Sequence, residues 1–373
     1  MLIRGRTFAP SWSLASQRMI GLFLAVLLAV LGCQPRSVED AVGIDPSKPT
    51  EPLSAIEAVA ETRRDGNGDF IEVDLRGADS VEILSQLADL PKLRSLILAG
   101  TPASDEHLES IANIATLENL DLRQCPVTDG GLAKLAGLKR LKAIKLSGKD
   151  SVTKVGDDAL QSLASLPNLK VLALDYLPIT DTGFAALGAN KQWVELYLAG
   201  TEITDESAET LATFSELKKC RLAATDFSDS GVKQLAGLSQ LVDLDLSECV
   251  GVGDASGQPL GSLAKLSKLN LWSTGMGDAG AEQLAASDSL RWLNLDNTQL
   301  TDRALPAIGK LRGLTFLHLG STAITDDGLP ALADLKQLEK LVVTRTGVTA
   351  DGVQALQEQL PSTEIQLVYV PGK

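Results

Sequence analysis

The sequence predicts an α/β fold, a right-handed horseshoe-shaped solenoid with a parallel sheet on its concave face and short helices on its convex face. Three observations support this prediction. A pattern of about 24 residues recurs along most of the chain, each copy begins with alternating leucines as in a strand, and each continues with apolar residues spaced by three as in a helix. One copy cannot bury a strand face and a helix face alone, so the copies must stack.

The composition of the 373 residues narrows the possible functions. Asp and Glu number 48 against 34 Lys and Arg, which gives a net charge of −14 and argues against a nucleic-acid-binding surface, because phosphate contacts need a basic stripe. Apolar residues make up 44% of the chain, enough to bury a core. Two histidines and four cysteines leave little material for a zinc site or a Cys/His nucleophile pair, so no metal, cofactor or catalytic residue is predicted.

Residues 1–32 have the composition of a signal peptide. Arginines without any acidic residue precede an apolar run from Met19 to Gly32, which is shorter than the ~20 residues that a membrane-spanning helix needs. The run ends in Val30-Leu31-Gly32-Cys33, which resembles the lipobox of bacterial lipoproteins. The resemblance implies cleavage before Cys33 and lipidation of that cysteine, hence an extracytoplasmic, membrane-anchored protein of the bacterial cell envelope. A conventional secreted product and an uncleaved anchor are the alternatives.

Two segments connect this signal to the repeats. Residues 33–52 contain four prolines and little apolar mass, which predicts a disordered tether. Residues 53–69 are predicted to form an N-terminal cap helix running to Arg64 and then a turn, with Ile56 and Val59 covering the first repeat. The turn Asp65–Asp69 starts like a calcium-binding loop but lacks the glycine and glutamate that such a loop needs further on, so no calcium site is predicted.

Twelve repeats are predicted over residues 70–361, followed by a C-terminal capping strand in residues 362–373. Successive repeats start 23 to 25 residues apart, except for one repeat of 28 residues over 141–168. Parallel strands stack ~4.8 Å apart whereas helices need ~10 Å, so the strands must line the inner arc and the helices the outer arc. The repeats begin at Phe70, Leu93, Leu117, Leu141, Leu169, Trp193, Leu217, Leu241, Leu266, Leu290, Leu314 and Leu338.

One complete repeat is LENLDLRQCPVTDGGLAKLAGLKR, from Leu117. It resembles the cysteine-containing subtype of the leucine-rich-repeat family, L-x-x-L-x-L-x-x-C-x-x-I-T-D-x-G-L-x-x-L. The resemblance extends from Phe70 to about Val370, although the subtype's cysteine stands only at Cys125 and Cys249 and threonine replaces it in most other repeats. F-box adaptors of ubiquitin ligases and several bacterial proteins carry this subtype. The export signal argues against the ubiquitin-ligase role, so the resemblance implies a bacterial leucine-rich-repeat lipoprotein.

Equivalent positions of the repeats form columns. The threonine column is predicted to bond neighbouring backbone amides through its hydroxyls. The aspartates that start the convex helices are predicted to cap those helices, at ~1 kcal/mol each, rather than to hold a row of cations. A glycine column in the same helices indicates close packing. The aspartates are Asp105, Asp129, Asp181, Asp205, Asp229, Asp254, Asp278, Asp302 and Asp326, and the glycines are Gly131, Gly183, Gly231, Gly280, Gly328 and Gly352.

The three cysteines inside the repeats are predicted to be free and buried. Cys220 occupies an inward leucine position of its strand. Stacking holds Cys125 and Cys249 five repeats apart, far beyond the ~7 Å that a disulfide allows between Cα atoms.

Concave side chains lie two, four and six places after the first leucine of each repeat. From Leu93 onward, six acidic and six basic residues occupy these places, so the face carries no net charge. Four of them alternate in sign along one row, which predicts cross-strand pairing of solvated charges. These four are Glu195, Lys219, Asp243 and Lys268.

A second zone of the concave face is aromatic. Aromatic residues are typical anchors of protein interfaces, and neighbouring rings can together reach the few hundred Å² of apolar surface that monomers rarely leave bare. The alternative is that long neighbouring side chains fold over these rings. The candidate partner-binding residues are Trp272, Trp292, Asn294, Asp296, Phe316 and His318, with Tyr197 extending the surface.

These observations favour a non-catalytic protein–protein interaction module. His318 is the single histidine on the concave face, and a flat sheet offers no cleft that excludes water, so an enzyme is not expected. The predicted partner is a protein or peptide on the concave face of a monomer, with the membrane reached through the lipid anchor and no nucleic acid bound. The alternatives are a structural envelope protein that assembles with its neighbours and a secreted effector of the leucine-rich-repeat type.

Overall fold

The computed structural model describes residues 52–368. The signal peptide predicted in residues 1–32, the lipidation of Cys33, the tether up to residue 51 and the last five residues of the strand predicted in 362–373 lie outside the described residues. Among residues 52–368, no helix combines the length and the apolar character that a membrane span requires.

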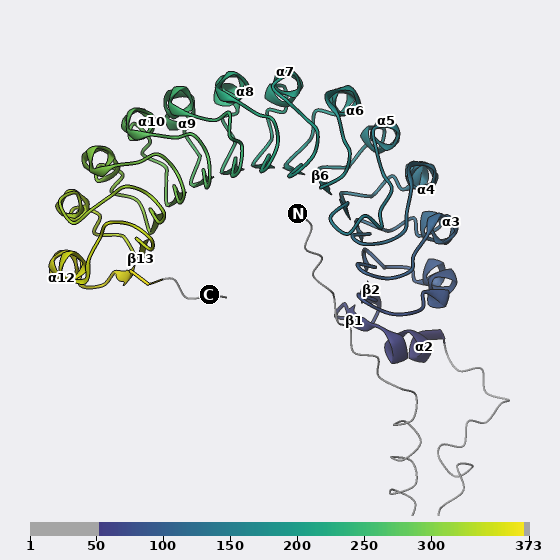
Figure 1. Cartoon of the computed structure of the whole chain (residues 1–373). Coiled ribbons are helices and arrows are strands. Elements are labelled where there is room, and N and C mark those ends of the chain that lie inside the picture. The colour runs from purple at the N-terminus through teal and green to yellow at the C-terminus, as the bar shows by residue number, and fades with distance from the viewer. Residues whose placement is uncertain (1–51, 369–373) are drawn as a thin grey trace, which may run out of the picture. The chain divides into compact units, whose positions relative to one another are not determined.

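A single sheet of 14 strands runs through residues 52–368, and its strands lie side by side in chain order (Figure 1). β2 to β14 are parallel, whereas β1 is antiparallel to β2. The strands are β1 (Glu61–Arg64), β2 (Phe70–Asp74), β3 (Ser95–Ile97), β4 (Asn119–Asp121), β5 (Ala143–Ser147), β6 (Val171–Asp175), β7 (Glu195–Tyr197), β8 (Lys219–Arg221), β9 (Asp243–Asp245), β10 (Lys268–Asn270), β11 (Trp292–Asn294), β12 (Phe316–His318), β13 (Lys340–Val342) and β14 (Glu364–Gln366).

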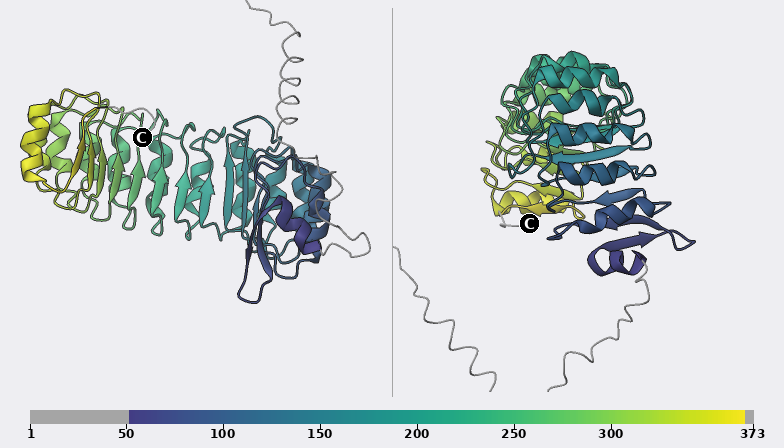
Figure 2. Two further views of the ribbon diagram at one scale, coloured as in Figure 1. Left: turned by 90° about the horizontal axis from the view of Figure 1, so that it is seen from below. Right: turned by 90° about the vertical axis from the view of Figure 1, so that its right-hand side faces the viewer.

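Short helices connect the strands on the outer side of the arc, while the strands form rungs along its inner side (Figures 1 and 2). The predicted α/β solenoid is therefore confirmed. The α-helices are α2 (Pro52–Val59), α3 (Asp105–Ala112), α4 (Asp129–Ala133), α5 (Asp158–Ala164), α6 (Asp181–Ala186), α7 (Ser207–Ala212), α8 (Asp229–Gln234), α9 (Gly257–Gly261), α10 (Asp278–Leu284), α11 (Leu305–Ile308) and α12 (Ala350–Gln359). The 3-10 helices are η2 (Glu82–Asp89), η3 (Lys134–Gly137), η4 (Leu187–Ala189), η5 (Leu235–Gly237), η6 (Asp254–Ser256), η7 (Asp302–Ala304) and η8 (Leu329–Leu332).

Leucines of adjacent strands lie in register and form the core between the sheet and the helices. Leu244, Leu269 and Leu293 pair across β9, β10 and β11, and each is fully buried. Burying one such side chain stabilises the fold by ~1.5–3 kcal/mol, and every repeat contributes several. Trp193 replaces the first leucine of its repeat, is equally buried and donates its indole N–H to the carbonyl oxygen of Leu187 at 3.1 Å.

The N-terminal cap differs from its prediction in two respects. Helix α2 ends at Val59, and Glu61–Arg64, predicted as the end of this helix, instead form β1 against β2. Ile56 is buried as predicted, but Val59 is 55% exposed and does not cover the first repeat. Pairing with β2 overrides helix propensity here, and the Arg64 guanidinium gains a cation–π contact 3.8 Å from the centre of the Phe70 ring. Because β1 is charged and mostly exposed, it protects this edge of the sheet from further pairing.

The aspartate column does not cap the helices in which it lies, contrary to prediction. Each carboxylate instead accepts hydrogen bonds from the following repeat, an arrangement that we call the aspartate ladder. Asp302 accepts the backbone N–H of Thr325 at 2.7 Å and its hydroxyl at 2.6 Å. Where a side chain caps such a helix, it is the preceding Thr or Ser, as at Thr301, whose hydroxyl accepts the N–H of Arg303. Gly253 and Gly277 stand at this place before Asp254 and Asp278 and provide no side-chain cap. Equivalent pairs are Asp105–Thr128, Asp157–Thr180, Asp181–Thr204, Asp205–Ser228, Asp278–Thr301 and Asp326–Thr349.

The glycine column exists because the aspartate ladder occupies the space of a side chain. A Cβ atom at Gly183 would lie 2.1 Å from Oδ1 of Asp157, and one at Gly131 would lie 2.0 Å from Oδ1 of Asp105. The predicted close packing is thus confirmed and has a specific cause. Where serine replaces the glycine, its hydroxyl joins the ladder, as Ser207 does by donating to Asp181 at 2.5 Å.

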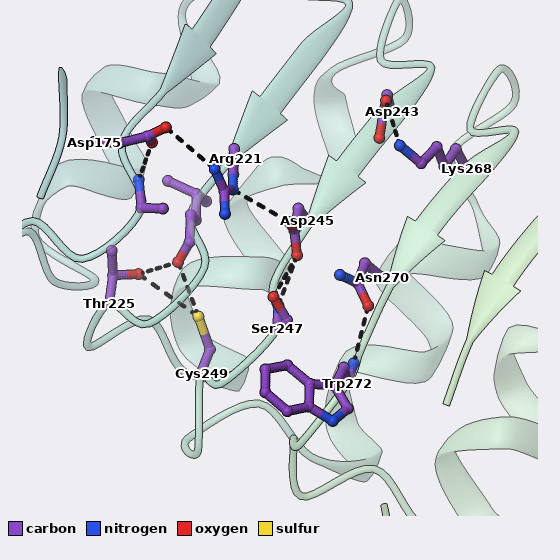
Figure 3. A network of polar contacts seen from close by, with 12 residues as sticks. Asp175, Arg221, Thr225, Asp243, Asp245, Ser247, Cys249, Lys268, Asn270 and Trp272 are labelled. Atoms are coloured by element: carbon purple, nitrogen blue, oxygen red, sulfur yellow. Dashed lines mark hydrogen bonds and ion pairs between the residues drawn. The ribbon is translucent and has the colours of Figure 1, made fainter. Parts of the chain in front are cut away.

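The threonine column bonds carbonyl oxygens, and at Thr101 and Thr346 the hydroxyl also accepts a backbone N–H, as predicted. Thr225 donates its hydroxyl to the carbonyl oxygen of Leu222 at 2.6 Å, within its own repeat. Cys249, in the same column one repeat later, donates its thiol to this carbonyl at 3.0 Å, so one acceptor joins two repeats (Figure 3). Cys125, Cys220 and Cys249 are free and buried, as predicted, and burial raises the pKa of each thiol.

The turns that follow the strands contain a residue with positive φ, in the left-handed region of the backbone. Ala224 has φ of 54° and Tyr176 has φ of 62°, although such conformations cost a non-glycine residue ~1–2 kcal/mol. Other residues with positive φ along this edge are Gly77, Gly100, Gln124, Ser151, Gly200, Glu248, Ser273, Asn297, Ser321 and Arg345. At each of these turns the chain leaves the sheet and runs toward the convex side.

Candidate partner-binding surface on the concave face

The parallel register arranges the concave side chains in rows across the strands. The first row places the predicted charged residues beside the predicted aromatic ones, and the second row runs parallel to it. Trp272 and Asp296 lie just beyond the ends of β10 and β11. The first row is Glu195, Lys219, Asp243, Lys268, Trp292, Phe316, Lys340 and Glu364, and the second is Tyr197, Arg221, Asp245, Asn270, Asn294, His318, Val342 and Gln366.

The charged half of the surface, on β7 to β10, is neutralised by its own ion pairs. Lys219 lies 3.0 Å from Glu195, and Lys268 lies 3.3 Å from Asp243. The cross-strand pairing predicted for this row is therefore confirmed. Because these groups satisfy one another, this half presents little uncompensated charge to a partner.

Arg221 joins three repeats in the second row of the charged half. Its guanidinium lies 3.2 Å from Asp175 and 3.4 Å from Asp245 (Figure 3). Asp245 also accepts the N–H of Ser247 at 3.0 Å and its hydroxyl at 2.7 Å. Burial raises the pKa of Asp175, against the opposing effects of the Ala199 N–H and Arg221.

The aromatic half, on β10 to β12, contains a stacked pair of rings. The rings of Trp292 and Phe316 lie 4.8 Å apart with an angle of 6° between their planes, and each is half-buried. The Lys268 ammonium lies 5.3 Å from the centre of the Trp292 ring, and the ring centres of Phe316 and His318 lie 6.4 Å apart in an edge-to-face arrangement. Neighbouring side chains thus cover part of the stack and leave the rest accessible.

Trp272 and Tyr197 stand apart from this stack. Trp272 is 37% exposed, and its indole extends from the end of β10 toward the side of β9 (Figure 3). Tyr197 lies on β7 and donates its hydroxyl to Glu195 at 2.7 Å, so it belongs to the charged half. The structure therefore brings Trp292, Phe316, Asn294, His318 and Asp296 together, with Trp272 beside them and Tyr197 four strands away.

Comparisons with known proteins agree with this geometry. A sequence model described as leucine-rich repeat matches residues 113–136 and 311–333. The chain folds as a leucine-rich-repeat solenoid. An internalin (inlF) from Listeria monocytogenes has a similar structure, with a TM-score of 0.62 and 17% identity over 86% of this chain and 95% of its own.

Two further solved structures resemble the solenoid. The leucine-rich-repeat ectodomain of the Arabidopsis thaliana receptor kinase GASSHO1/SCHENGEN3, solved in complex with CASPARIAN STRIP INTEGRITY FACTOR 2, has a TM-score of 0.52 and 17% identity over 83% of this chain and 40% of its own. The Rad7 and Elc1 complex from yeast has a TM-score of 0.50 and 20% identity over 75% of this chain and 83% of its own. Identities this low relate the chains by fold alone. No curated protein matches the solenoid in sequence.

Two shallow hollows on the concave face of the solenoid were missed by the sequence reasoning. One, of about 210 Å³, is lined by the charged half, including Tyr197, Lys219 and Arg221. The other, of about 340 Å³, lies over β3 to β5, where Ser95, Asn119 and Ala143 place short side chains in one row. This run of short residues was the signal that could have revealed the second hollow.

The imidazole of His318 should make the stability of the solenoid pH-dependent. Burial lowers the pKa of His318, helped by Lys340 and opposed by Asp296. Below the unfolded-state pKa of ~6.5, His318 binds a proton more readily in the unfolded than in the folded chain. The free energy of unfolding should therefore fall as the pH drops from 7 to 5, by at most ~1.4 kcal/mol per pH unit. In urea titrations across this range, His318→Gln should lose less stability than the wild type. Parallel pH profiles of the two proteins would contradict this assignment.

Proposed function

We propose that the solenoid is a non-catalytic protein–protein interaction module whose concave face binds a protein or an extended peptide. The chain acts as a monomer, is exported, and is held at a bacterial envelope membrane by a lipid on Cys33. The repeats are of the cysteine-containing subtype, whose cysteine is kept at Cys125 and Cys249 and replaced by threonine in most other repeats.

The observation that carries the proposal is the accessible aromatic surface on β10 to β12. No segment within residues 52–368 covers the Trp292–Phe316 stack, and Trp272 is 37% exposed beside it. Aromatic side chains bury a large area with little loss of conformational entropy, which is why they dominate the binding energy of many interfaces. Two structures with this fold, the receptor ectodomain and the Rad7–Elc1 pair, are complexes, which supports the same role.

The arrangement of polar groups favours binding over catalysis. His318 lies 3.9 Å from Asp296, with no serine or cysteine nucleophile in its rows. The neighbouring strands present side chains on an open sheet, and a reaction that must exclude water would lack walls there.

Partner capture tests the proposal. Tagged wild-type protein, anchored in its native cell, should recover a heterologous protein by proximity labelling, and Trp292→Ala should lose that partner while keeping its circular dichroism spectrum. Val250→Ala removes an apolar side chain that is 83% exposed away from the rows, so it should retain the partner. Equal recovery by wild type and Trp292→Ala would exclude the aromatic surface, and recovery of the chain itself alone would favour the assembly function instead.

The membrane anchor requires a separate experiment. Cys33→Ser should shift the protein from the membrane fraction to the soluble fraction and abolish incorporation of a labelled fatty acid, because two or more acyl chains are needed for stable anchoring and all would be attached at this residue. Cys125→Ser, which changes a buried thiol in the repeats, is the matched control. A Cys33→Ser protein that still fractionates with membranes would contradict lipidation as the anchor.

A further inference from the structure

Carboxylates on the concave rows almost all have a cation beside them. In the repeats that begin at Leu93 to Leu338, five of the six concave acids lie within 3.4 Å of a lysine or arginine. Asp296 is the exception, since the group that faces it is the imidazole of His318, at 3.9 Å. The five paired acids are Asp121, Asp175, Glu195, Asp243 and Asp245.

The Asp296 carboxylate is partly buried and has no hydrogen-bond donor beside it within residues 52–368. Its side chain is only 19% exposed, yet its oxygens accept no hydrogen bond from any of residues 52–368. The 3.9 Å gap to Nε2 of His318 is too long for a hydrogen bond, and burial favours the neutral imidazole. A carboxylate that lacks a cation and a donor can gain both from a ligand, because charge-assisted hydrogen bonds are the strong ones.

Polar groups next to Asp296 offer donors to a ligand. Asn294 accepts the N–H of Asp296 at 3.0 Å through its side-chain oxygen, and Asn270 accepts the N–H of Trp272 at 3.2 Å in the same way (Figure 3). This fixes both amides with their NH₂ groups unpaired among the described residues. In an earlier repeat, Asp121 and Arg123 stand where Asn294 and Asp296 stand here. Asp121 accepts the N–H of Arg123 and forms an ion pair with its guanidinium, so the two charges satisfy each other.

We propose that Asp296 binds the guanidinium of an arginine side chain in an extended peptide segment of the partner, and that this segment crosses the Trp292–Phe316 stack. A guanidinium supplies the missing charge and presents several donors in a fixed fork, enough for both Asp296 and His318. The Asn270 and Asn294 amides then donate to carbonyl groups of the peptide backbone. The net charge of −14 favours encounter with a basic segment. This inference rests on the proposed function and specifies its ligand.

A phage-displayed library of random dodecapeptides is the probe. Wild-type protein should select peptides enriched in arginine, and replacing that arginine with neutral citrulline in a synthetic peptide should weaken binding at least ~10-fold, as expected for a charge-assisted hydrogen-bonded pair. With Asp296→Asn, the arginine and citrulline peptides should bind within ~2-fold of each other. Asp121→Asn, a concave carboxylate that already has its arginine, should keep the wild-type preference.

The outcomes separate this inference from the proposed function. Peptides selected without arginine, or an arginine preference that survives Asp296→Asn, would overturn the arginine site while leaving a peptide-binding face intact. No selected peptide, together with no captured partner, would overturn both. A glycan array on which the wild type retains saccharides, with no peptide selected, would reassign the aromatic surface to sugars.

Discussion

Replacing Gly183 with alanine should lower the free energy of unfolding by about 3 kcal/mol. The new Cβ would lie 2.1 Å from Oδ1 and 2.3 Å from Cγ of Asp157, so the whole carboxyl group must move. Asp157 then releases the N–H of Thr180, now held at 2.9 Å, and its hydroxyl, held at 2.6 Å. Urea unfolding followed by circular dichroism measures the loss.

Controls for this prediction come from the same chain. A Cβ at Gly137 meets nothing within 4 Å, so Gly137→Ala should change the stability by less than ~1 kcal/mol and in the favourable direction. The double variant Asp157→Ala/Gly183→Ala should cost less than the sum of its single changes, because removing the carboxylate also removes the clash. Additive costs, or a Gly183→Ala protein as stable as the wild type, would show that the aspartate ladder does not constrain this position.

Replacing Arg221 with methionine should lower the stability by about 2 kcal/mol at pH 7.5, less than the cost of breaking a fully buried pair because these groups retain some solvent contact. Methionine keeps the length of the stem but leaves Asp175 and Asp245 facing each other without a cation. Burial and the Asp245 charge already raise the pKa of Asp175, and loss of Arg221 raises it further.

The pH dependence distinguishes this electrostatic effect from a packing defect. When the pKa of a carboxyl group is higher in the folded than in the unfolded state, its destabilising effect grows as the pH rises between the two values and is complete above the folded one. The cost of Arg221→Met should therefore shrink between pH 7.5 and pH 5. Arg312→Met, which removes an exposed pair with Asp334, should cost under ~1 kcal/mol at either pH. A cost that is equal at both pH values would indicate lost packing instead.

Sequence periodicity predicted the architecture because one spacing rule recurs in every repeat. The leucine columns, the concave rows and the charge pairs follow directly from register, and Lys219 and Glu195 meet as that register requires. β1 was missed because Glu61–Arg64 continues a helical composition, and only its partner strand shows that it is extended. Local composition does not record such a distant contact.

The roles of the columns depend on which repeat a side chain reaches. Asp302 has hydrogen-bond donors in its own helix and in the next repeat, and the sequence is the same for either choice. The candidate site shows the same limit. Trp292 and Trp272 were predicted on one surface, yet the first stacks on Phe316 while the second turns toward β9 (Figure 3). Side-chain rotamers decide this difference, and periodicity does not encode them.

The aspartate ladder has a head-to-tail polarity. Each repeat that begins between Leu117 and Leu314 offers an acceptor to the next repeat and a donor to the preceding one. A copy of such a repeat that is duplicated or deleted in frame therefore meets complementary chemistry at both of its junctions. These hydrogen bonds tolerate a change in repeat length. In the 28-residue repeat, the N–H of Gly156 donates to Asp129 of the preceding repeat, and Asp157 accepts the N–H of Thr180 in the next one. The length of the arc can therefore change through the copy number of the repeats, without a redesign of the contacts between them.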